Sequence, residues 1–134
     1  MERHEILACL DTQYKIKIIG LLEVLRDRLS GRDFPLGQIC DASTWVDTYA
    51  WGFAVNDCAL VQIAILERLL PENGINFRLA FFDMGGKRVF SKFIPHWVDE
   101  NDPAAVEQKW AEFAQMVQTE MGEIVSVIVA KVGG

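Results

Sequence analysis

The sequence lacks a long apolar run, a set of metal ligands at a known spacing, and an excess of basic charge. No stretch reaches the roughly 18 uninterrupted apolar residues of a membrane span. The two histidines and three cysteines fall into no zinc or calcium spacing, so we predict no metal and no cofactor. The net charge of −6 argues against nucleic acid as a partner, because acidic surfaces repel phosphate.

Cysteine usage and the first residues bear on the compartment. Cys9, Cys40 and Cys58 stand far apart and are odd in number, which fits free thiols better than a disulfide framework. The opening MERHEILACL has charge on both sides of a short apolar stretch, unlike a secretory signal. We therefore expect a cytoplasmic protein without a membrane partner. The 134 residues match the usual size of one domain, 1–134.

Two long helices are predicted in the first half of the chain. From Glu2 to Ser30, leucines and isoleucines recur at steps of three and four, and Gly31 stands where a helix commonly ends. Alternation over residues 15–18 makes a local strand the minority interpretation. A second helix is predicted from about Ser43 to Leu70, before the stop signal PENG.

The second half predicts a hairpin, a third helix and an ambiguous tail. Two runs rich in Phe, Ile and Val flank DMGG within residues 75–94, as in a β-hairpin. Asp102 and Pro103 suit the start of a helix. For residues 123–132, β-branched composition favours a strand slightly over a continued buried helix. The predicted fold is α+β: two long N-terminal helices, a β-hairpin, a third helix and a C-terminal strand in one compact domain.

The hairpin is a basic island in an acidic chain. Residues 75–97 carry four basic side chains against one acidic side chain, Asp83. Such asymmetry can orient a partner, although a solvated strand face is the ordinary explanation. We predict a partner-binding surface formed by Arg78, Lys87, Arg88, Lys92 and Trp97.

Asp57 is the most unusual polar residue, because it lies inside the apolar run WGFAVNDCALVQIAI. On a continuous helix it would face apolar neighbours, where an unpaired carboxylate is costly. There it would pair with Lys15 or Lys17, or serve a ligand. If the helix breaks at Gly52 instead, Asp57 would cap a second helix. The ligand interpretation predicts a pocket between the first two helices, lined by Trp45, Tyr49, Asp57 and Cys40.

The leading functional hypothesis is a small, non-enzymatic binding protein that acts through protein contacts. An inhibitor, an immunity-type factor and a chaperone-like adaptor are all of this class, and a homodimer would cover exposed apolar surface. A small-ligand or metal sensor using the predicted pocket is the first alternative. The second is a small enzyme that uses Cys40, His96 or Asp57.

Overall fold

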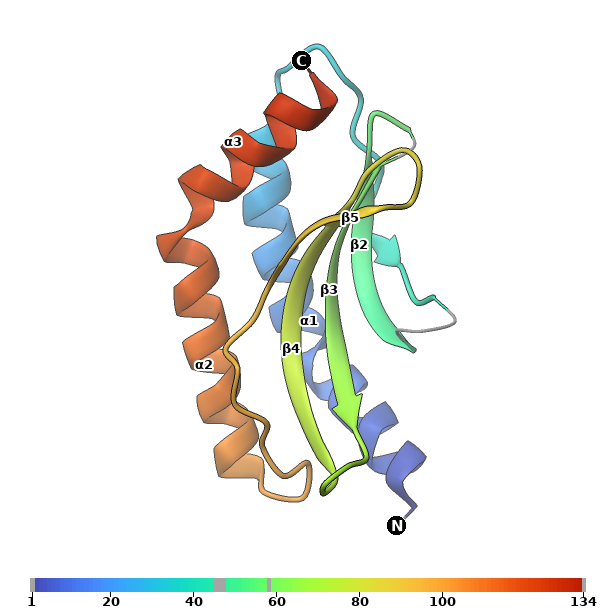
Figure 1. Cartoon of the computed structure of the whole chain (residues 1–134), viewed down its shortest axis with the longest axis vertical. Helices are drawn as coiled ribbons and strands as arrows, with labels where there is room; N and C mark the ends of the chain where they lie inside the picture. Colours follow the sequence, from blue (N-terminus) through green and yellow to red (C-terminus); the bar gives the residue numbers. More distant parts are fainter. Residues whose placement is uncertain (1, 45–47, 58, 134) are drawn as a thin grey trace.

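The computed structural model describes residues 2–44, 48–57 and 59–133. Helix α1 (Arg3–Leu29) precedes a five-stranded sheet, and helices α2 (Pro103–Thr119) and α3 (Met121–Val132) follow it (Figure 1). The strands are β1 (Cys40–Asp41), β2 (Tyr49–Val55), β3 (Ala59–Arg68), β4 (Gly74–Phe82) and β5 (Arg88–Lys92).

The sheet is an antiparallel meander in the order β1-β2-β3-β4-β5. All three helices lie against the same face of it (Figure 1). Alternate strand residues such as Phe53, Ile63 and Phe77 point to this face and form one core with the helices. The ring of Phe77 meets that of Trp110 edge-on, with centroids 5.1 Å apart. Helix-to-sheet packing therefore positions the central strands β2, β3 and β4.

The predicted first helix is confirmed as α1. Its buried side chains follow the expected steps of three and four, from Leu7 to Leu29. Residues 15–18 continue the helix, so the minority strand interpretation is wrong. Gly31, at φ 78°, takes the left-handed conformation that commonly follows a helix end.

The predicted second helix is wrong, and so is the predicted arrangement of two long N-terminal helices and a hairpin, although the protein is of the α+β class. Residues 49–68 form the β2–β3 hairpin, whose register pairs Tyr49 with Ile65 and Val55 with Ala59. The alternation that should have identified β3 is hidden by its location at the centre of the sheet. On the helix-free face, alternate residues of β3 include Ala64 and Gln62, which are fully buried, so nearly the whole strand is apolar or small.

Asp57 owes its position in the apolar run to the turn of this hairpin. Asn56 and Asp57 have φ of 54° and 68°. Asn and Asp tolerate this left-handed conformation better than most other residues. Asp57 is exposed, so the predictions of a helix cap and of a buried ion pair with Lys15 or Lys17 are both wrong.

The second half of the chain follows the prediction except at its end. The hairpin is confirmed as β4 and β5, and Asp102 caps α2 by accepting a hydrogen bond from the Ala105 N–H at 3.2 Å. The preferred strand over residues 123–132 is wrong, because this segment belongs to α3. Its buried residues Met121, Ile124, Val125 and Ile128 repeat at helical spacing, which outweighs the strand preference of β-branched residues.

An ion pair fixes the start of α1 to the far end of the sheet. Arg3 Nε lies 2.7 Å from Glu100 Oε2, and Arg3 Nη2 donates to the carbonyls of Arg68 and Gly74 at 2.8 and 3.1 Å. Glu100 precedes α2, so this contact joins three parts of the chain. Within the described residues, no helix is both long enough and apolar enough to cross a membrane.

Candidate functional site: the β4–β5 hairpin

The loop of the β4–β5 hairpin is ordered by its own first residue. Asp83 Oδ1 accepts hydrogen bonds from the N–H groups of Gly85 and Lys87, at 3.0 and 2.9 Å. The Asp83 N–H donates to the Lys87 carbonyl at 2.8 Å and closes the loop. Gly86 takes φ 79°, which a residue with a Cβ adopts only under strain. The hairpin therefore presents its tip in one fixed conformation.

This tip and the strand after it expose two basic and two apolar side chains. Lys87 and Arg88 are exposed, and neither forms an ion pair with a carboxylate of the described residues. Met84 is 62% exposed at the tip, and Phe93 is 42% exposed just after β5. Cationic and apolar groups together are typical of a protein-binding surface.

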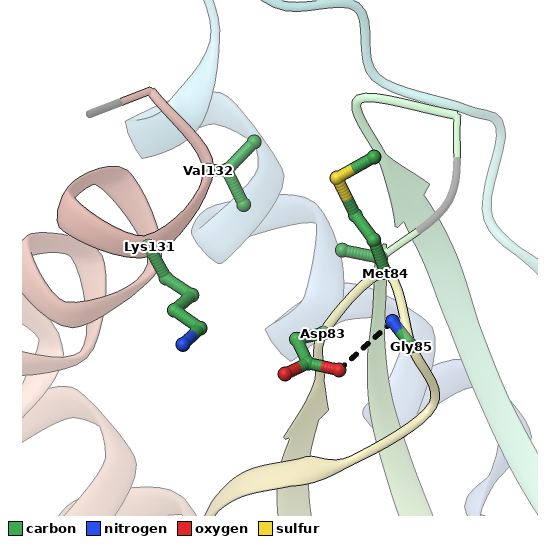
Figure 2. A pocket seen from close by; sticks show the side chains of 6 residues that line it. Asp83, Met84, Gly85, Lys131 and Val132 are labelled. Atoms are coloured by element: carbon green, nitrogen blue, oxygen red, sulfur yellow. Dashed lines mark hydrogen bonds between the residues drawn. The ribbon is translucent and has the colours of Figure 1, made fainter.

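A small pocket lies between the hairpin loop and the end of α3 (Figure 2). Its volume is 160 Å³, similar to the roughly 150 Å³ cavity that holds a benzene-sized group in another protein. Lys131 extends from α3 toward the Asp83 carboxylate, and Met84 stands on the other side (Figure 2). The pocket is lined by Ala59, Asp83, Met84, Gly85, Lys131 and Val132.

β5 is an edge of the sheet. It pairs with β4 on one side, and the described residues offer its backbone no further hydrogen bond on the other. The opposite edge is different, because residues 36–42 run along β2. There Gly37 N–H donates to the Ala54 carbonyl and Ala42 N–H to the Ala50 carbonyl, both at 2.9 Å. Of the two edge strands, β1 has only two residues, so the longer open edge is that of β5, beside Lys87 and Arg88.

The predicted partner surface is divided by the fold. Arg78 is buried on the helix-free face, where its Nη2 donates to Gln62 Oε1 at 3.4 Å. Lys92 Nζ lies 2.7 Å from Glu120 Oε1 and serves the contact between β5 and the helices. The half-buried Trp97 packs under the Arg68 guanidinium, 5.3 Å from its ring centroid. Lys87 and Arg88 remain together at the hairpin.

The predicted ligand set is not brought together. Tyr49 begins β2 and Asp57 lies in the turn after that strand, so the length of β2 separates them. Cys40 is exposed on β1, opposite Gly52, and Trp45 lies outside the described residues. The expected pocket is wrong, because the second helix that would have formed its wall is a strand pair. His96 follows β5, at the edge of the sheet opposite Cys40.

The predicted partner surface does not include Met84, Phe93 and Lys131. Lys131 and Met84 are 47 positions apart and meet only because α3 is a helix that returns over the sheet. The positions of Met84 and Phe93 beside the predicted hairpin were the available signal. An exposed Met at a hairpin tip or a Phe just after a strand gives little reason for suspicion by itself.

Ionisable groups with shifted pKa values lie elsewhere. Burial raises the pKa of Asp11, which accepts a hydrogen bond from Trp51 Nε1 at 3.1 Å. Burial lowers the pKa of Lys109 on α2. Hydrogen bonds from Lys17 and Tyr14 lower the pKa of Glu107. Within the described residues, no three or more His, Cys, Asp or Glu side chains are grouped as metal ligands would be.

Comparison of the chain with protein-family models, curated proteins and solved structures found no match.

Proposed function

We propose that this chain is a small cytoplasmic binding protein that engages a partner protein through the β4–β5 hairpin. The observation that carries the proposal is the unpaired edge of β5, with two exposed basic side chains, Lys87 and Arg88, at its start. The ordered loop supports it, because a surface fixed before binding loses less conformational entropy on association. Regulation or inhibition of the partner would follow from occupation of the partner's own surface.

The exposed thiols support the cytoplasmic assignment. Cys9 and Cys40 are free and exposed, a state that a reducing compartment preserves. The homodimer stays a prediction. Ile16 on α1 is 83% exposed, so sedimentation of the wild type beside an Ile16→Lys variant tests it.

Charge reversal at the hairpin tests the proposed function. Tagged protein carrying Lys87→Glu and Arg88→Glu should lose a partner that the wild type captures from its native cells. The matched control reverses Arg28 and Arg32, which are equally charged and exposed but lie at the end of α1 and just after it. Capture that is equal in all three proteins would refute a role for the hairpin. Loss in both variants would show a general effect of charge.

A further inference from the structure

We infer that the bound part of the partner is an extended acidic segment, which adds to the sheet as a strand alongside β5. This inference rests on the proposed function and names the chemistry of its partner. Strand addition uses backbone hydrogen bonds for affinity and alternate side chains for specificity. Within the part of the chain that the structure describes, the outer edge of β5 has both unpaired backbone groups and alternating side chains.

The backbone groups that would receive the segment follow from the register. Ile75 exchanges two backbone hydrogen bonds with Val98 across the outer side of β4, at 2.9 and 3.1 Å. Hydrogen-bonding direction alternates along an antiparallel strand, so Leu79 bonds toward the same side. Its partner is Lys92, whose N–H and C=O therefore point back to β4. The N–H and C=O of the neighbouring Ser91 point away from the sheet.

The charges at this edge select an acidic segment. Lys87 and Arg88 stand at the start of β5, so a carboxylate on the incoming strand would lie beside them. A second copy of this chain fits less well. In antiparallel pairing of two β5 strands about Phe90, Arg88 of one copy would face Lys92 of the other, and like charges placed opposite each other are destabilising. Basic residues on an edge also prevent self-association, which is the ordinary explanation.

Apolar side chains beside β5 define the other half of the pattern. Val89 is half-buried and Phe93 is exposed. Val89, Ser91 and Phe93 are alternate residues, so they form a row on one face of the strand. An added strand whose alternate residues are apolar would cover this row. The pocket beside Met84 lies at the hairpin end, and Ala59, Met84 and Val132 give it apolar walls. The inferred segment thus alternates acidic with apolar residues, such as Glu with Val.

A proline at Ser91 separates strand addition from charge attraction. Ser91→Pro removes the outward N–H and leaves the β4 hydrogen bonds in place, as edge strands allow. Ser91→Ala is the matched control, because it removes only the hydroxyl. The probe is a short acetylated peptide of alternating Glu and Val, and a Lys-Val peptide is its counterpart. Binding is followed by amide NMR shifts and by titration, and thermal melting confirms that each variant is folded.

We expect the Glu-Val peptide to shift the amides of residues 88–92, and the Lys-Val peptide to leave them unchanged. Ser91→Pro should weaken binding up to about tenfold, as the loss of one backbone hydrogen bond implies, and Ser91→Ala should bind like the wild type. If Ser91→Pro melts early, N-methylation of the peptide residue opposite Ser91 tests the reciprocal hydrogen bond, from the peptide N–H to the Ser91 carbonyl.

Three results would overturn the inference. The first is that neither peptide binds, and the second is that both bind equally. The third is that Ser91→Pro and the N-methylated peptide bind as tightly as their controls. In the first case the charges of β5 only protect an edge. The proposed function would stand in each case if reversal of Lys87 and Arg88 still abolished partner capture, because that measurement requires no strand addition.

Discussion

The ion pair between Arg3 and Glu100 gives the strongest single prediction about stability. Only 1% of the Glu100 side chain is exposed, and its Oε2 lies 2.7 Å from Arg3 Nε. Replacement of Arg3 by Ala would leave a buried carboxylate without its counter-charge. Breaking a buried pair in this way typically costs about 3–5 kcal/mol. The carbonyls of Arg68 and Gly74 would also lose a donor, but water can replace it at this partly exposed end.

A loss of this size is large beside the 5–15 kcal/mol that typically separates folded from unfolded states. Urea unfolding followed by circular dichroism measures it for Arg3→Ala, Glu100→Ala and the double variant. The double variant should be more stable than the sum of the single losses implies, by roughly 2 kcal/mol, because it removes both charges together. A loss below about 1 kcal/mol for Arg3→Ala, or strict additivity, would refute the reasoning, since Glu100 would then not depend on Arg3.

Two other substitutions test the sheet and α2. Gly52→Ala should lower the free energy of unfolding by about 1–3 kcal/mol or more, since the added Cβ would lie 2.1 Å from the Val61 carbonyl oxygen; an unchanged melting temperature would contradict this. Lys109→Met should stabilise the protein at neutral pH, because burial lowers the pKa of Lys109 and the cost of keeping its ammonium in the folded protein is fully present below the folded pKa. The gain should shrink as pH rises through the folded pKa toward the ordinary lysine value, and a gain independent of pH would contradict this cause.

Elements with a clear local signal could be predicted from the sequence. The helix α1 buries a stripe of leucines and exposes charge, so its period is plain in the residues. The hairpin of β4 and β5 carries its turn signal in Gly85 and Gly86, and α2 begins with its cap, Asp102. In each case the local pattern and the tertiary environment agree, which is why the prediction held.

Elements without such a signal could not be predicted in this way, and burial alone does not separate them, because β4 is also buried along most of its length. β3 lies between β2 and β4 and is buried along most of its length, so its apolar residues carry no period that separates strand from helix. The same ambiguity affected α3, where helical spacing and strand composition disagreed. The Asn56-Asp57 pair is a turn signal inside the apolar run, but on a predicted helix the same two residues are only polar groups on an apolar face.

The basic residues of 75–97 show that a count of charges in the sequence overstates how many of them lie on one exposed surface. Strand alternation turns Arg78 to the helix-free face, and Glu120 engages Lys92 from the helices. What remains is a pair of cations, Lys87 and Arg88, at the hairpin end of one open edge. Because the pocket lies at that same end, the proposed recognition would be concentrated there, and the rest of β5 would contribute backbone hydrogen bonds. Substitutions in the partner segment near the hairpin should therefore weaken binding strongly, and substitutions farther along the strand should matter less.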